Sequence, residues 1–74
     1  MDEERAGVVK RSIAIAGHRT SVSLEEEFWD ELRRLAARRG LSIAALIAEI
    51  DGGRRRQNLS SAIRVHVLRE ALAR

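Results

Sequence analysis

The chain has 74 residues, of which 45% are hydrophobic and 34% are charged, and its net charge is +3. This composition suits one small domain and argues against a disordered tail. A chain this short buries only roughly 60% of its unfolded surface, so we expect it to associate with another chain. The absence of Cys excludes disulfides and thiolate metal sites, and two isolated histidines, His18 and His66, do not have metal-ligand spacing.

The N-terminal part predicts a flexible arm at residues 1–9, followed by a single domain at residues 10–74. Residues 8–15 favour a β-strand, and Ala16-Gly17 can turn the chain back on itself. A two-residue turn would place Ile13 opposite Thr20 and Arg11 opposite Val22. The alternative is an extended arm that becomes ordered only on binding, and the sequence leaves both open.

Residues 19–25 alternate between polar and apolar side chains and lead directly into a helical pattern. Because side chains on a strand have period two, one face carries Thr20, Val22 and Leu24, and the other carries Arg19, Ser21 and Ser23. Ser23 has a second interpretation, because Ser23 and Glu26 have the spacing of a capping box that would begin the helix.

Three helices follow from the apolar spacing. The first carries Leu24, Phe28, Leu32, Leu35 and Ala36 on one face, with Asp30 and Arg34 as a favourable pair on the other, and ends at Gly40. Trp29 is expected in the core or in a dimer interface.

The second helix is capped by Ser42, carries Ile43, Leu46, Ile47 and Ile50, and runs to about Asp51, where residues 52–57 break the pattern. The third, at residues 58–73, is capped by Asn58 and has one stripe of Leu59, Ile63 and Val67 and a second of Val65, Leu68 and Leu72. A helix that is apolar on two sides must bury both, which again predicts a partner.

Two segments, Arg19-Thr20-Ser21-Val22-Ser23-Leu24-Glu25-Glu26-Glu27-Phe28-Trp29 and Arg38-Arg39-Gly40-Leu41-Ser42, resemble the ribbon-helix-helix family of DNA-binding proteins, over about residues 10 to 51. The longer pattern from Lys10 to Val65 is similar to a bacterial subfamily of short ribbon-helix-helix-like proteins. The resemblance implies a mainly α fold with a short N-terminal β-ribbon, in a ribbon-helix-helix dimer with an additional C-terminal helix.

The resemblance also implies site residues. Strands of two chains would pair antiparallel into a ribbon that enters the major groove, where Arg19, Ser21 and Ser23 would contact bases. Phosphate contacts would come from Lys10, Arg11, Ser42, Ile43 and Ala44, the last two through backbone N–H groups at a helix N-terminus. The dimer core would consist of Thr20, Val22, Leu24, Phe28, Leu32, Leu46, Ile47 and Ile50.

The function expected from these observations is specific or semi-specific binding of double-stranded DNA by a homo-oligomeric bacterial transcriptional regulator, a repressor. We expect no enzyme, catalytic residue, metal or cofactor, because the chain has no Cys nucleophile, no Gly-rich phosphate loop and no Ser, His and carboxylate grouping. Its partners would be DNA and itself, as a homodimer or tetramer. Without an apolar run of roughly 20 residues or a signal peptide, it is expected in the cytoplasm and not in a membrane. The alternative is an antitoxin-like or adaptor module whose third helix binds another protein.

Overall fold

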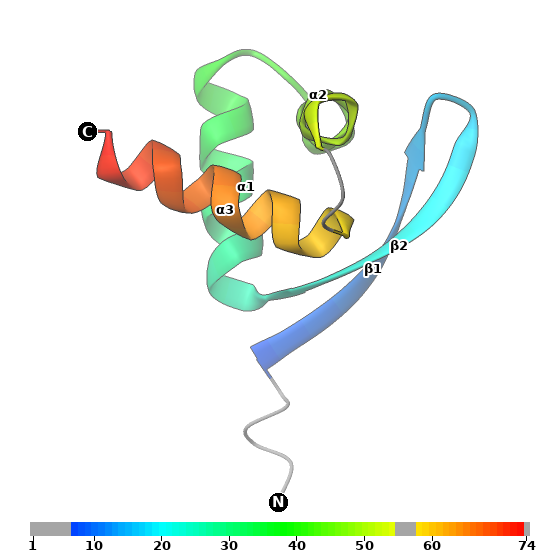
Figure 1. The fold of residues 1–74 in the computed structure, drawn as a ribbon, viewed down its shortest axis with the longest axis horizontal. Helices are drawn as coiled ribbons and strands as arrows, with labels where there is room; N and C mark the ends of the chain where they lie inside the picture. The colour runs from blue at the N-terminus through cyan, green and yellow to red at the C-terminus, as the bar shows by residue number, and fades with distance from the viewer. Residues whose placement is uncertain (1–6, 55–57, 74) are drawn as a thin grey trace, which may run out of the picture.

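A two-stranded antiparallel ribbon precedes three helices, which confirms the expected fold class (Figure 1). The computed structural model describes residues 7–54 and 58–73. Residues 1–6 of the expected arm and residues 55–57 of the expected break lie outside the described residues, whereas Val8 and Val9 already belong to the first strand. The elements are β1 (Val8–Ile15), β2 (His18–Glu25), α1 (Glu26–Arg38), α2 (Ile43–Gly53) and α3 (Leu59–Leu72).

Both strands of the ribbon come from the same chain. β1 pairs with β2 so that Ile13 lies opposite Thr20 and Arg11 lies opposite Val22, the register that a two-residue turn predicts. The pairing of strands from two chains stays a prediction. Of the two alternatives for residues 8–15, the structure has the strand and turn rather than the extended arm. The physical reason is the turn itself: Ala16 and Gly17 both have positive φ, 51° and 83°, and such a turn matches the right-handed twist of the two strands it joins.

Ala16 is therefore held in the left-handed region, which is unfavourable for a residue with a Cβ atom. Replacing Ala16 by Asn, which tolerates the left-handed region, is expected to raise the free energy of unfolding by about 0.5–1 kcal/mol. Gly17→Ala is the matched variant of opposite sign, with an expected loss of about 1 kcal/mol. A Cβ at Gly17 meets nothing within 4 Å, so this loss is purely conformational. Urea titration measures the change in the free energy of unfolding for both variants. Changes of the same sign would contradict the strain at Ala16.

α1 begins directly after β2, and this start decides which residues it buries. Its N-cap is Glu25, whose side chain makes no capping bond, and Ser23 lies within β2, so the capping-box alternative for Ser23 is wrong. The buried residues of α1 are Trp29, Leu32, Leu35 and Ala36. Because Leu24 belongs to the strand, the core-facing row of the helix passes through Trp29. Phe28 is only half-buried and packs against the edge of this core.

Local signals at the other helix ends act as expected, with one exception. After α1, Gly40 has φ +68°, its N–H donates to Ala37, and the Leu41 N–H donates to Ala36, which is a Schellman ending. The side chains of Ser42 and Asn58 accept from the N–H groups three residues later and cap α2 and α3.

The exception is the C-terminal end of α2, which was expected near Asp51 but extends through Gly52 to Gly53. Glycine lowers helix stability without forbidding a last turn, and the Arg54 Nε donates to the Asp51 carboxylate at 2.6 Å across that turn. On α1, Asp30 pairs with Arg33 at 2.6 Å rather than with the expected Arg34, which lies 3.6 Å from Glu31.

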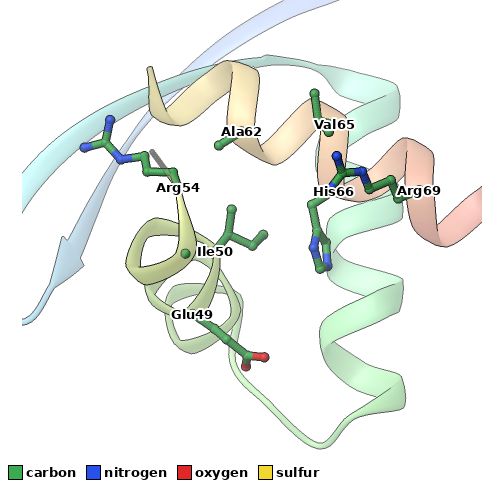
Figure 2. Close-up of a pocket in the computed structure, with 8 residues that line it drawn as sticks. Glu49, Ile50, Arg54, Ala62, Val65, His66 and Arg69 are labelled. Carbon is green, nitrogen blue, oxygen red and sulfur yellow. The ribbon is translucent and has the colours of Figure 1, made fainter. Parts of the chain in front are cut away.

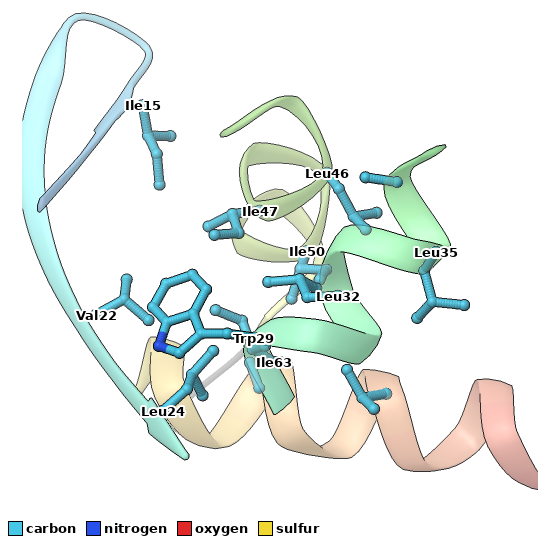
Figure 3. Close-up of a cluster of buried hydrophobic side chains, with 13 residues drawn as sticks. Ile15, Val22, Leu24, Trp29, Leu32, Leu35, Leu46, Ile47, Ile50 and Ile63 are labelled. Carbon is cyan, nitrogen blue, oxygen red and sulfur yellow. The ribbon is translucent and has the colours of Figure 1, made fainter. Parts of the chain in front are cut away.

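The helices cover one face of the ribbon and enclose the core between the two layers (Figures 1 and 3). Six residues expected in an interface between chains are buried by this chain itself: Val22, Leu24, Leu32, Leu46, Ile47 and Ile50. Thr20 and Phe28, from the same set, are half-buried. α3 contributes Ala62, Ile63 and Val67 to this core, so the additional helix is an integral part of the domain.

Within residues 7–54 and 58–73, no helix is both long enough and apolar enough to cross a membrane.

Candidate nucleic-acid interface

The ribbon has one face on the core and one face that points away from the helices. Residues directly opposite each other in an antiparallel pair share a face. The core face carries Val9, Ile13 and Ile15 of β1 with Val22 and Leu24 of β2. The other face, called the outer ribbon face here, carries the pairs Val8 and Glu25, Lys10 and Ser23, Ser12 and Ser21, and Ala14 and Arg19.

The outer ribbon face brings together all three residues expected to contact bases. Arg19 and Ser21 are exposed, and Ser23 is half-buried. Lys10, expected at phosphate, is exposed on the same face beside Ser23. This face therefore presents two cations and a row of short hydroxyl side chains, a composition that suits contacts with an acidic, hydrogen-bonding surface.

Sequence reasoning missed one member of this group, Ser12. The Arg19 guanidinium donates to Ser12 Oγ at 3.3 Å, so the side chain with the longest reach on this face is positioned by the neighbouring strand. Ser12 is exposed and lies opposite Ser21. The signal that could have found Ser12 was the two-residue turn, because pairing Ile13 with Thr20 necessarily pairs Ser12 with Ser21.

α3 fixes the end of β2 nearest to α1. The backbone N–H of Ser23 donates to Ser60 Oγ at 3.3 Å, which satisfies the side of β2 that faces away from β1. The Arg64 Nε donates to the Glu25 carboxylate at 3.0 Å. The Arg64 guanidinium holds the pKa of Glu25 below its usual value. Glu25 therefore stays ionised and paired at neutral pH, and its negative charge on the outer ribbon face is balanced by Arg64.

Arg11 is separated from this group, because it lies on the core face of the ribbon. Its guanidinium lies 5.2 Å from the centre of the Trp29 ring. Arg11 thus covers the core tryptophan with a cation–π contact while its charge stays exposed to solvent. The structure thus places Arg11 against Trp29 and away from the outer ribbon face, whereas the resemblance implied that Arg11 contacts phosphate.

Ser42, Ile43 and Ala44 form a second candidate position at the start of α2. The Ala45 N–H already donates to Ser42 Oγ at 3.0 Å, whereas the N–H groups of Ile43 and Ala44 precede the hydrogen-bond ladder of the helix. The turn end of the ribbon shares a surface cavity with Asp51 and Arg54, at the other end of α2. With 11 residues, α2 is about 16 Å long, and Ser42 lies at its opposite end.

A cavity of about 270 Å³ lies between α2 and α3 (Figure 2). Basic side chains at its rim include His66 and Arg69, and the Glu49 carboxylate there is paired with Arg39 at 3.0 Å. Across the part of the chain that the structure describes, no group of three or more His, Cys, Asp or Glu residues could hold a metal ion.

Comparisons with known proteins identify the family and a similar fold. The ribbon-helix-helix domain model matches residues 8–71, from the first residue of β1 to one residue before the end of α3. Among solved structures, the chain is similar to an uncharacterized protein from Bordetella pertussis Tohama I, with 37% sequence identity and a TM-score of 0.74 over 88% of this chain. This chain spans 56% of the length of that protein. No curated protein matches the chain significantly.

Proposed function

Because this chain belongs to the ribbon-helix-helix domain family, a family of DNA-binding regulators, we propose that it binds double-stranded DNA through its outer ribbon face. The observation that carries the proposal is the division of the ribbon into a buried apolar face and an exposed face with Lys10, Arg19 and three serines. The major groove of B-DNA admits a two-stranded β-ribbon, and base edges there offer the acceptors and donors that such side chains bind.

In this proposal the side chains have separate roles. Arg19 gives a bidentate contact to guanine, with Ser12, Ser21 and Ser23 contacting neighbouring base edges. Lys10 contacts phosphate, as do Ser42 and the backbone N–H groups of Ile43 and Ala44 on the flanking backbone. Phosphate contacts fix the register on the duplex, and the outer ribbon face reads the sequence. Because one chain supplies both strands, each chain inserts a complete ribbon.

The biological role proposed is that of a bacterial transcriptional regulator that binds as a homodimer. The similarity to a Bordetella pertussis protein supports a bacterial setting, and dimeric binding is general in the family. In this proposal it acts as a repressor, by occupying its DNA site and excluding other proteins from it.

The experiment first selects preferred sequences from a random duplex library and then measures affinity for a selected and a scrambled duplex over a salt series. Arg19→Ala is expected to weaken binding to the selected duplex by roughly 5- to 150-fold and to reduce the preference over the scrambled one. Lys10→Ala is expected to weaken both equally and to reduce the slope of log affinity against log salt by about 1.

Arg34→Ala is the matched control, because it removes the same charge from the exposed surface of α1. Its affinity is expected to stay within about twofold of wild type, as for a distant charge that salt screens. Arg19→Lys separates readout from charge, since lysine keeps the charge without the planar fork. Wild-type binding that is absent at low salt, or unaffected by both Arg19→Ala and Lys10→Ala, would contradict the proposal.

A further inference from the structure

The cavity between α2 and α3 has an apolar floor (Figure 2). Ile50 of α2 and Ala62 of α3 lie there with exposed fractions of only 9% and 6%, and Val65 of α3 lines the same cavity with 38% of its surface exposed. The volume of about 270 Å³ is just below the usual range for small-molecule sites, roughly 300–1,000 Å³. The cavity therefore has room for a small ligand, and its floor favours a ligand with an apolar part.

The wall of this cavity on α3 carries two basic side chains, His66 and Arg69. They are three residues apart and share one face of the helix, and Figure 2 shows the Arg69 side chain extending back along α3 toward His66. Within the part of the chain that the structure describes, neither side chain takes part in a hydrogen bond or an ion pair. Beyond His66, a second cavity of about 90 Å³ is lined in part by Arg38 and Glu70, one charge of each sign. His66 and Arg69 thus offer N–H donors to a molecule that occupies the α2–α3 cavity.

The other charges in the lining of this cavity already have partners. The Glu49 carboxylate is paired with the Arg39 guanidinium at 3.0 Å, and the Arg54 guanidinium is paired with the Asp51 carboxylate at 2.6 Å. Each pair is neutral overall, so the permanent charge left over at the cavity is that of Arg69, which stays protonated at physiological pH. The cavity therefore favours an anion, and the apolar floor favours an anion that carries a hydrocarbon part.

We propose that this cavity binds a small organic monocarboxylate, with its carboxylate on Arg69 and His66 and its hydrocarbon part over Ile50 and Ala62. The planar guanidinium of arginine donates two parallel hydrogen bonds to a carboxylate, and an imidazole N–H adds a third. One free guanidinium matches one carboxylate, whereas inorganic phosphate would leave the apolar floor uncovered. Because the ligand contacts both helices, it holds α2 against α3.

The test titrates the full chain without DNA, so its outcome is independent of the proposed DNA binding. Acetate, butyrate and benzoate are added in turn at constant ionic strength, and the backbone amide shifts are followed by NMR. Benzoate is expected to bind saturably with a Kd of about 1 mM or tighter, with the largest shifts near Ile50, Ala62 and Arg69. Butyrate is expected to bind roughly 15-fold more tightly than acetate, because two more CH₂ groups leave water. Benzamide, the neutral isostere of benzoate, is expected to bind more weakly than benzoate by about tenfold or more.

Arg69→Gln is expected to weaken benzoate binding by roughly 10- to 150-fold, because it removes the charged hydrogen bonds to the carboxylate. Arg69 is exposed, so the variant is expected to keep the fold, which its amide spectrum verifies. Arg33→Gln is the matched control, because it removes the same charge from the surface of α1, where Arg33 is paired with Asp30. Its affinity for benzoate is expected to stay within about twofold of wild type.

The proposal is overturned if none of the three carboxylates binds saturably, or if benzamide or inorganic phosphate binds as tightly as benzoate. An Arg69→Gln variant with the wild-type affinity for benzoate would also overturn it, since the carboxylate would then be held elsewhere.

Discussion

Replacing Trp29 by alanine is expected to lower the free energy of unfolding by about 3–5 kcal/mol, the range for truncating a large buried aromatic side chain. Trp29 is fully buried, and in Figure 3 its ring lies between the ribbon residues Val22 and Leu24 and the helices. Its Nε1–H donates to the Val9 carbonyl at 2.9 Å, and Arg11 covers its ring. Trp29 thus joins the ribbon to the helical layer through apolar contact, a hydrogen bond and a cation–π contact.

The loss is a large part of the stability of a small domain, whose total is about 5–15 kcal/mol. We therefore expect Trp29→Ala to be largely unfolded near 37 °C. Because Trp29 is the single tryptophan, the measurement is urea unfolding followed by far-UV circular dichroism at one fixed chain concentration. Trp29→Phe keeps most of the apolar contact and removes the donor, so it is expected to lose about 1–2 kcal/mol. Equal losses of unfolding free energy for the two variants would contradict the conclusion that the apolar contacts of the ring stabilise the domain.

Truncating Ile63 on α3 is expected to cost about 2–5 kcal/mol. Ile63 is fully buried in the same core as Val22, Leu24 and Trp29. If α3 is integral to the domain, Ile63→Ala lowers the urea midpoint of a single unfolding transition of the whole chain. Ile63→Val, which removes one methyl group, is expected to lose about 0.5–1.5 kcal/mol.

Val8→Ala serves as the surface control, with an expected change within about 0.5 kcal/mol. The measurement is urea unfolding, read both by Trp29 fluorescence and by circular dichroism. Coincident curves at reduced stability are expected for Ile63→Ala. A second transition, or a loss below about 1 kcal/mol, would show that α3 is an appendage and would contradict the fold assignment.

The candidate site could be predicted only in part. Arg19, Ser21 and Ser23 share a face because alternation along one strand fixes it, and this holds whichever strand is the partner. The alternation of β2 does not show that Ser12 lies on this face or that Arg11 lies on the core face. Both positions depend on the register between β1 and β2. A shift of one residue in that register would exchange the faces of Ser12 and Arg11.

By itself, the sequence determined what short-range interactions control: the alternating faces of β2, the caps at Ser42 and Asn58, and the Gly40 ending of α1. Each of these features depends on a few neighbouring residues, so the local sequence pattern is sufficient to predict it. Only the tertiary structure decided that the ribbon closes within one chain, because a strand satisfies its hydrogen bonds equally with its own or a partner's strand. It also decided that Trp29 and not Phe28 enters the core, since that choice depends on where α1 begins and on how α3 packs across it.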